Sequence, residues 1–382
     1  MSTYQASDLL RLAKRHHNVK RTYLLVDPLQ GKHIPVSPSR ALSMLRELGR
    51  AMAAAEPGID LVIGFAETAT AVAAAAAEGM GRPCRYVHTT REAFVPGPAV
   101  EFREEHSHAV EQRLSLARLA GWIDGARAVA FVDDELSTGR TLMNVIDQLS
   151  AACPSLREKP ILAASIISRL DGAHRAALAE HGVRGCASLL HLPLEDYTEA
   201  VRGYDIAGAE PPSGPRLAVP EIALPPSTGD ARLGVELMPW LDELRASAEG
   251  LLDALRPRLA GKRVTVLGTE EYMLPGLVLG EALERAGVAK RARFHATTRS
   301  PIGICGAEGY PIQSGWRLHS FYDPERTTFI YDLEPCDAAV ILTDSPDGEA
   351  TVLAAADLAA ALRERGCGDV ILLREACHVQ HL

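Results

Sequence analysis

One stretch of the sequence, residues 128–141, constrains the fold more than any other. It reads AVAFVDDELSTGRT: an apolar run, then the carboxylates of Asp133 and Asp134, then a turn of small residues. Beyond the turn, apolar residues recur at the spacing of a helix. Strand, acidic pair, small-residue turn and helix, in this order, are typical of a parallel α/β sheet with an anion site at a helix N-terminus.

The turn predicts a phosphate site. Its backbone N–H groups and hydroxyls can surround a phosphate monoester, and a glycine lets the main chain approach closely. The acidic pair would repel phosphate but suits sugar hydroxyls or Mg²⁺. A ligand with a phosphate at one end and a vicinal diol at the other is a ribose 5-phosphate. The simpler alternative is a solvated acidic turn that only caps a helix. The residues expected to hold the phosphate are Ser137, Thr138, Gly139, Arg140 and Thr141.

FVDDELSTGRT resembles the phosphoribosyl pyrophosphate motif of type I phosphoribosyltransferases. The resemblance implies that Asp133 and Asp134 are catalytic residues that hold the ribose hydroxyls and Mg²⁺, and that residues 137–141 hold the 5-phosphate. In the 6-oxopurine members, the third residue after the acidic pair is an Asp that serves the purine, whereas Ser137 stands here. A hypoxanthine or guanine acceptor is therefore not expected, and the acceptor stays open.

A second strand–turn–helix unit precedes this motif at residues 59–80, with the turn GFAET. The resemblance assigns Ala66, Glu67 and Thr68 in this turn to pyrophosphate binding. The carboxylate of Glu67 would repel pyrophosphate unless Mg²⁺ lies between them, so the alternative is that it orients a base or a sugar hydroxyl. Lys32 and His33, in the turn Gly31-Lys32-His33, are placed on a glycine hinge to close over a pyrophosphate, although an exposed turn uses the same residues.

Residues 93–114 lack a clean period, and a long irregular segment within a domain is usually functional or disordered. At this point the resemblance implies a loop that closes over the reacting pyrophosphate and excludes water. The alternative is a plain surface loop. Arg91, His106 and His108 are the candidate catalytic residues of the closing loops. A metal site at the two histidines would lack a third ligand at helical spacing.

Composition limits the classes of partner. The chain has 382 residues, a net charge of −9 and a pI near 5.8, which argues against nucleic acid as a bulk partner. Its seven cysteines are scattered and form no CxxC pair, as in a reduced protein. No signal peptide or membrane-length apolar run is evident. We therefore expect a cytoplasmic protein without a membrane or nucleic-acid partner, which binds a phosphorylated sugar donor and an unknown acceptor and forms a homodimer.

At least five strand–helix units alternate in the first half, which predicts a mostly parallel α/β sheet with flanking helices; by resemblance this is the type I phosphoribosyltransferase sheet. Residues 209–233 contain six prolines and no helical pattern, and are expected to form a stiff linker. We therefore expect one domain at residues 1–208 and a second α/β domain at residues 234–382.

The second half repeats the plan of the first. GFAET at residues 64–68 is answered by GTEEY at 268–272, HTTR at 88–91 by ATTR at 296–299, and VDDELSTG by TDSPDGEA. We infer, as a hypothesis, that the second domain is a divergent copy whose altered phosphate loop does not bind the sugar donor in the same way. The hypothesis requires that Gly64 and Gly268 end equivalent strands. The alternative is that any two α/β domains share this pattern.

The tetrapeptide at residues 298–301, Thr-Arg-Ser-Pro, resembles the TRSP domain, which follows a predicted phosphoribosyltransferase in proteins of bacterial tellurium-resistance and stress gene clusters. Arg299 and the GTEEYM loop are expected to line a second ligand pocket. The combined resemblance implies an enzyme of nucleotide metabolism that transfers a 5-phosphoribosyl group with Mg²⁺ as cofactor. The alternative function is a non-catalytic sensor of the same donor or of a nucleotide. No residue stands out as the general base.

Overall fold

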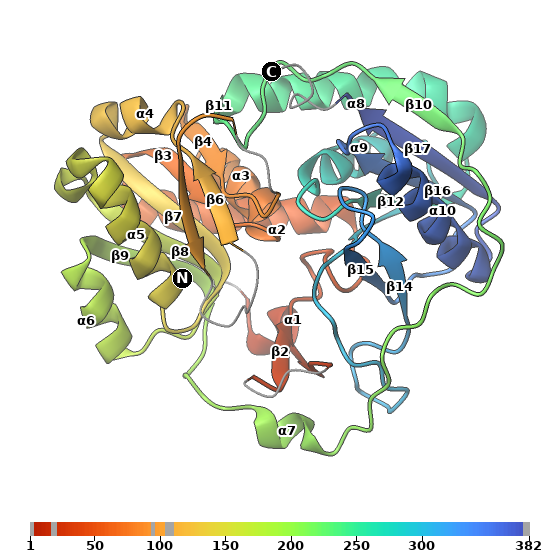
Figure 1. Ribbon diagram of the computed structural model, residues 1–382, viewed down its shortest axis with the longest axis horizontal. Coiled ribbons are helices and arrows are strands. Elements are labelled where there is room, and N and C mark those ends of the chain that lie inside the picture. Colours follow the sequence, from red (N-terminus) through yellow and green to blue (C-terminus); the bar gives the residue numbers. More distant parts are fainter. Residues whose placement is uncertain (1–3, 17–20, 93–95, 104–110, 377–382) are drawn as a thin grey trace.

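The computed structural model describes residues 4–16, 21–92, 96–103 and 111–376. Two sheets lie side by side, with helices between and around them (Figure 1). The N-terminal sheet has the strand order β11-β4-β3-β7-β8-β9, and the C-terminal sheet has the order β10-β17-β16-β12-β13. Neighbouring strands are parallel except β11 and β4. The predicted fold class is confirmed for both halves.

The N-terminal sheet consists of strands rich in buried apolar residues, which is the pattern of a sheet covered on both faces. Seven of the eleven residues of its helix α3 are buried alanines, so neighbouring elements can approach it closely. The strands are β3 (Ile59–Gly64), β4 (Arg85–His88), β7 (Ala128–Leu136), β8 (Ile161–Ser168) and β9 (Val183–His191), and the helices are α2 (Pro38–Ala55), α3 (Ala69–Gly79), α4 (Leu119–Gly125), α5 (Arg140–Ala152) and α6 (Gly172–Glu180), with a 3₁₀ turn at Pro154–Glu158.

A small N-terminal hairpin lies against the C-terminal domain, in the lower part of Figure 1. It follows the short helix α1 (Ala6–Leu9) and pairs β1 (Arg11–Lys14) with β2 (Tyr23–Val26). Its buried Leu24 and Val26 pack in one cluster with Ile302, Tyr310 and Tyr331. Helix α7 (Thr198–Arg202) lies beside β1.

The segment expected to be irregular holds a second hairpin. Strands β5 (Ala99–Arg103) and β6 (Glu111–Ser115) pair antiparallel. Within β5, Val100 and Phe102 are buried and Glu101 is exposed, an alternation that is too short to be recognised in the sequence. The candidate residues His106 and His108 lie outside the described residues.

The C-terminal domain repeats the connectivity of the N-terminal one. After a helix, and apart from the additional α4 before β7, each domain runs strand, helix, strand, hairpin, strand, helix, strand, and the first of these strands lies between the second and the third in both sheets. Gly64 and Gly268 therefore end equivalent strands, as the duplication hypothesis requires. The elements of the second domain are α8 (Leu237–Leu259), β12 (Arg263–Gly268), α9 (Leu274–Arg285), β13 (Arg291–Ala296), β14 (Gly315–His319), β15 (Thr327–Tyr331), β16 (Ala338–Thr343), α10 (Glu349–Glu364) and β17 (Asp369–Glu375).

The register of the two sheets changes one residue pair in the proposed alignment of the two domains. Gly64 pairs with Val132, and Gly268 pairs with Leu342. If the two glycines are equivalent, Asp344 corresponds to Asp134, one residue away from the alignment read from the sequence.

The proline-rich segment is more than a linker. It contributes β10 (Glu221–Leu224), which pairs parallel with β17 at the edge of the C-terminal sheet, and is followed by β11 (Val235–Glu236) on β4. The chain runs along the outer side of the C-terminal domain to reach β10 (Figure 1). Pro220 and Pro225 flank the four strand residues without interrupting them, and an edge strand tolerates prolines at its ends. The domain limits at residues 208 and 234 stay a prediction.

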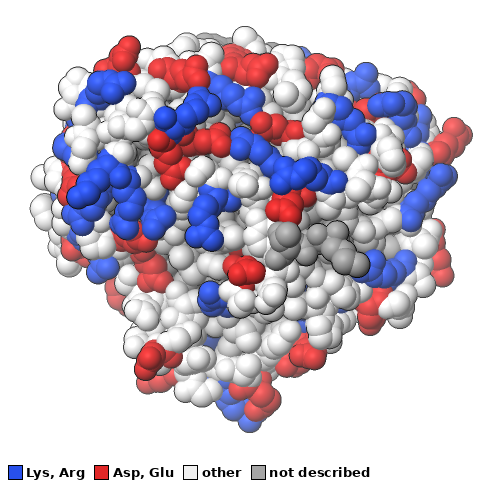
Figure 2. Space-filling view, turned by 180° about the vertical axis from the view of Figure 1, so that it is seen from behind, with Lys and Arg blue, Asp and Glu red and all other residues white. Residues whose placement is uncertain are grey.

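Basic side chains are interspersed with acidic ones on the rear face (Figure 2). No helix among the described residues combines the length and the apolar character needed to cross a membrane. The six cysteines in the described part of the chain are free, as expected.

One hydrophobic core crosses the boundary between the domains and includes residues of α2, α3, α8 and α9. Arg46 of α2 ties the layers together, because its guanidinium binds Glu78 of α3 at 2.9 Å and Glu281 of α9 at 2.8 Å. Helices α2 and α3 touch through glycines: a Cβ on Gly49 would lie 1.8 Å from the carbonyl oxygen of Ala76.

This contact predicts the effect of one methyl group. Gly49→Ala is expected to lower the free energy of unfolding by about 1–3 kcal/mol, since the helices must separate to accommodate the Cβ. Gly250→Ala on α8 is the matched control, because nothing lies within 4 Å of its Cβ position; it should raise stability by about 0.5–1 kcal/mol. Urea unfolding measures both, and a neutral Gly49→Ala would contradict the close packing of α2 on α3.

Candidate functional site

A cavity of about 350 Å³ lies at the carboxyl ends of β3 and β7. Every candidate residue from the sequence that lies in the described part of the chain lines this one cavity. They are Lys32, Ala66, Glu67, Thr68, Arg91, Asp133, Asp134, Ser137, Thr138, Gly139, Arg140, Thr141 and Arg299. The structure therefore brings together residues up to 267 positions apart in the sequence (Lys32 to Arg299).

The small-residue turn leads into the N-terminus of α5, which begins at Arg140. Gly139 precedes it with φ +76°, a conformation that favours glycine, and a Cβ there would also approach Leu178 to 3.1 Å. The first N–H groups of a helix have no partner within it and carry partial positive charge. The loop and the first turn of α5 thus form a suitable site for a phosphate.

The acidic pair is half-buried in the last part of β7. One oxygen of each carboxylate accepts the following backbone N–H: Asp134 N–H donates to Asp133 Oδ1 at 2.8 Å, and Glu135 N–H donates to Asp134 Oδ1 at 2.8 Å. The neighbouring Glu135 has a structural partner, because both its oxygens accept from Arg21 at 2.8 Å. Asp133 and Asp134 are the acids of β7 that remain suited to a ligand.

These two carboxylates fit Mg²⁺ only as an ion shared with a ligand. Among the described residues, no group of three or more His, Cys, Asp or Glu side chains is arranged to hold a metal. Mg²⁺ commonly binds through one or two carboxylates together with substrate phosphates and water. Asp133 and Asp134 supply the hard oxygen donors for that mode.

The turn after β3 is fixed from two sides. The Ala66–Glu67 peptide bond is cis. Ala66 N–H donates to Thr89 Oγ1 at 2.7 Å, and Gln112 Nε2 donates to the Ala66 carbonyl at 3.0 Å. Glu67 Oε2 accepts the N–H of Arg299 at 3.2 Å. Its Oε1 is buried and has no partner among the residues described.

Lys32 lies at the same turn. Its ammonium group donates to the hydroxyl of Thr68, and both residues are buried. The alternative of an exposed Gly31-Lys32-His33 turn is therefore wrong. The sequence could not show this, because the elements that cover the turn come from the other end of the chain.

Arg299 reaches this cavity from the C-terminal domain. Its guanidinium is held between Glu92 and Glu270, with 2.6 Å from Nε to the latter, and these carboxylates raise its pKa. Its backbone N–H donates a hydrogen bond to Glu67 Oε2. The next two residues, Ser300 and Pro301, also line the cavity. The expectation that Arg299 marks a separate second pocket is therefore wrong.

Further residues line the cavity, among them Asp27 and Gln30, which the sequence did not single out, and His33, which it paired with Lys32. Burial raises the pKa of Asp27 to about 7, with help from the nearby charge of Asp134. Burial also lowers the pKa of His33 well below 6.5. The turn Gly31-Lys32-His33 was the signal for this segment in the sequence.

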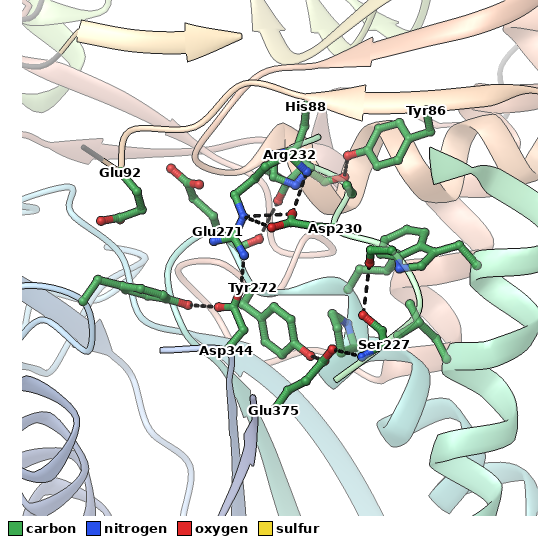
Figure 3. Close-up of a pocket in the computed structure, with 18 residues that line it drawn as sticks. Tyr86, His88, Glu92, Ser227, Asp230, Arg232, Glu271, Tyr272, Asp344 and Glu375 are labelled. Atoms are coloured by element: carbon green, nitrogen blue, oxygen red, sulfur yellow. Dashed lines mark hydrogen bonds and ion pairs between the residues drawn. The ribbon is translucent and has the colours of Figure 1, made fainter. Parts of the chain in front are cut away.

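The equivalent region of the C-terminal domain holds a small pocket, of about 60 Å³ (Figure 3). Its GTEEYM loop does line the pocket, through Glu271 and Tyr272. The space is occupied by the chain itself: Arg232 binds Asp230 at 2.9 Å and Asp344 at 2.5 Å. Asp344, the counterpart of Asp134, is thus neutralised internally, and the pocket is far below the usual size for a small-molecule ligand.

His88 and Glu271 also face this small pocket (Figure 3). Burial lowers the pKa of His88 to about 4 and raises the pKa of Glu271 to about 7. Both side chains are hydrogen-bonded: His88 Nδ1 lies 2.8 Å from the Thr89 carbonyl, and Glu271 accepts from the Thr90 hydroxyl at 2.6 Å. These contacts are consistent with a structural role at the domain boundary.

Comparison with known proteins finds a family model that matches each half of the chain. Residues 9–186 match the family model described as "Phosphoribosyl transferase" (PRTase_2), and residues 229–362 match the model "TRSP domain C terminus to PRTase_2". No curated protein sequence matches the chain.

Solved structures similar to the chain include two adenine phosphoribosyltransferases and an orotate phosphoribosyltransferase. The enzyme from Giardia lamblia, complexed with 9-deazaadenine, is 19% identical over 50% of this chain and 98% of its own, with a TM-score of 0.37. The one from Rhodothermus marinus is 14% identical over 49% and 96%, with a TM-score of 0.35. The orotate enzyme from Aeropyrum pernix is 23% identical over 40% and 71%, with a TM-score of 0.24. By its two family matches, the chain is a member of the phosphoribosyl transferase family in its N-terminal half, followed by a TRSP domain.

Proposed function

We propose that the chain is a Mg²⁺-dependent phosphoribosyltransferase that moves a 5-phosphoribosyl group between pyrophosphate and an acceptor. The observation that carries this proposal is the convergence of three elements on one cavity: the phosphate loop, the acidic pair and the turn after β3. Its volume, about 350 Å³, is within the range of small-molecule sites.

The roles follow from charge and position. The N-terminus of α5 and the hydroxyls of Ser137 and Thr141 hold the 5-phosphate, and their binding energy is remote from the bond that breaks. Asp133 and Asp134 accept hydrogen bonds from the ribose hydroxyls. Their negative charge also favours the positive charge that develops at the anomeric carbon.

The pyrophosphate is assigned to the turn formed by Ala66, Glu67 and Thr68, with Lys32 and Arg91 as nearby cations. Mg²⁺, held by the ligand together with Asp133 and Asp134, would neutralise the charge of the leaving group. The assignment of His106 and His108 to a loop that closes over the site stays a prediction. The cytoplasmic location, the homodimer and the link to tellurium resistance and stress also stay predictions.

Replacing the acidic pair tests this proposal. The double variant Asp133→Asn/Asp134→Asn is expected to bind phosphoribosyl pyrophosphate with Mg²⁺ at least about tenfold more weakly, since two charge-assisted contacts are lost. Isothermal titration calorimetry measures the affinity. Asp242→Asn/Asp253→Asn on exposed positions of α8 removes the same charge far from the cavity and should bind like the parent. Absence of binding to the parent protein would refute the proposed donor.

A second function, a sensor that binds the donor without reacting, is favoured by one observation. The buried Oε1 of Glu67 has no partner among the described residues and faces the place assigned to pyrophosphate. A carboxylate there opposes the approach of an anionic group unless a cation lies between. The same residue would therefore be either a contact for the cation or a block to catalysis.

Pyrophosphate release separates the two functions. With phosphoribosyl pyrophosphate, Mg²⁺ and a panel of bases and amines, an enzyme releases pyrophosphate only when its acceptor is present. Glu67→Gln, which keeps the shape and removes the charge, is expected to lower this release if Glu67 contacts the cation. Saturable binding of the donor without release for any acceptor would instead identify a sensor.

A further inference from the structure

One residue of the C-terminal domain, Glu271, contacts both elements that flank the turn of residues 66–68. It lies in the turn that follows β12 and is 8% exposed. Its main-chain carbonyl accepts the hydroxyl of Thr70, in the first turn of α3, at 2.8 Å. Its carboxylate accepts the hydroxyl of Thr90 at 2.6 Å and the backbone N–H of Arg91 at 2.7 Å. Because residues 66–68 lead into α3 and neighbour the end of β4, Glu271 fixes the surroundings of this turn.

The register of the sheet places Arg91 beside the same turn. Gly64, at the end of β3, pairs with His88 of the parallel strand β4, so the residues that follow these two lie next to each other. The link is direct at Ala66, whose N–H donates to the hydroxyl of Thr89 at 2.7 Å. Arg91 comes two residues later and lines the cavity. The hydrogen bond from Glu271 to the backbone of Arg91 therefore fixes where the guanidinium enters the cavity.

The cations of the cavity have different positions and partners. They are Arg15, Arg21, Lys32, Arg91, Arg140 and Arg299. Carboxylates bind Arg21 and Arg299. Arg140 belongs to the phosphate loop, and Arg15 follows β1 in the N-terminal hairpin. Lys32 donates to Thr68 within the turn itself, and Arg91 lies at the strand end next to it. Lys32 and Arg91 are thus the cations placed at the turn assigned to pyrophosphate.

The phosphate loop, by contrast, is supported from within the N-terminal domain. A Cβ on Gly139 would lie 3.1 Å from Leu178 of α6, which packs against the loop. Glu135, at the end of β7, accepts both its hydrogen bonds from Arg21 at 2.8 Å. The contacts of Glu271 lie at α3 and β4 instead. Loss of the Glu271 side chain should therefore act on the pyrophosphate end of the cavity and spare the phosphate loop.

We propose that Glu271, a residue of the TRSP domain, is a positioning residue of the pyrophosphate subsite, because it holds the backbone of Arg91 so that the guanidinium faces the leaving group. By this role the TRSP domain completes the pyrophosphate end of a cavity whose phosphate end belongs to the other domain. The inference rests on the proposed function, since it takes residues 66–68 and 137–141 as the two ends of one donor site.

The experiment compares two ligands that differ by the pyrophosphate group. Calorimetry on the full chain with Mg²⁺ measures phosphoribosyl pyrophosphate and ribose 5-phosphate. Glu271→Ala is expected to weaken the first about tenfold, as for the loss of one hydrogen bond to a charged group, and to leave the second unchanged. Glu364→Ala is the matched control, because that carboxylate also accepts backbone N–H groups, of Ser213 and Gly214, but on the outer side of the domain. It should change neither affinity.

Two further variants show whether Glu271 acts through Arg91. Arg91→Ala is expected to weaken phosphoribosyl pyrophosphate at least about tenfold, and Glu271→Ala added to it should change the affinity by less than about twofold, since both act through one contact. Glu271→Gln keeps an acceptor for the Arg91 N–H and should bind within about threefold of the parent. If Glu271→Ala does not fold, Glu271→Asp takes its place, because its shorter side chain withdraws the acceptor, and the same weakening is expected.

The two proposals fail on different results. If ribose 5-phosphate does not bind the parent, or phosphoribosyl pyrophosphate binds no more tightly than it does, the proposed function fails and the positioning role fails with it. If the parent binds both ligands as expected but the Glu271 variant weakens both alike, or neither, the positioning role alone is overturned. It is also overturned if Glu271→Ala weakens binding further in Arg91→Ala, or if Glu271→Gln binds as weakly as Glu271→Ala.

Discussion

The structure depends on a reciprocal exchange across the domain boundary. Glu67 accepts the backbone N–H of Arg299, and Glu271 accepts the backbone N–H of Arg91 at 2.7 Å. Each domain thus supplies an acidic side chain after its first core strand and receives a main-chain donor after the other domain's second strand. Glutamates are rarely buried without partners, so these contacts fix how the two sheets meet. This arrangement positions the part of the first domain's cavity wall that Arg299, Ser300 and Pro301 of the C-terminal domain form.

The two domains share a plan but differ in what fills the end of the sheet. In the first, the acids of β7 are half-buried beside an open cavity. In the second, the equivalent Asp344 holds Arg232, which comes from the segment before α8. Burial of an arginine is tolerated because two carboxylates surround it. A contact within the chain therefore fills the position that lies beside the open cavity in the first domain.

Much of this could be predicted from the sequence, because the strand–turn–helix signals are local. The phosphate loop, the acidic pair and the second α/β domain all follow from residue types at fixed spacing. Contacts between distant segments could not be predicted. The burial of Lys32, the role of Arg299 at the first cavity and the wall formed by Asp27 and His33 depend on contacts between segments about 260 residues apart. The edge strand β10 was not predicted, because the six prolines of residues 209–233 favoured a linker.

The continuous core across the boundary has a consequence for how the cavity is assembled. A site built between two separate subunits loses its second wall when dilution separates them, since association depends on concentration. Here both walls belong to one chain, so their meeting is an intramolecular event with an effective concentration set by the connecting segment. The completeness of the cavity is therefore a property of folding alone, and it is the same in a dilute solution as in a crowded one.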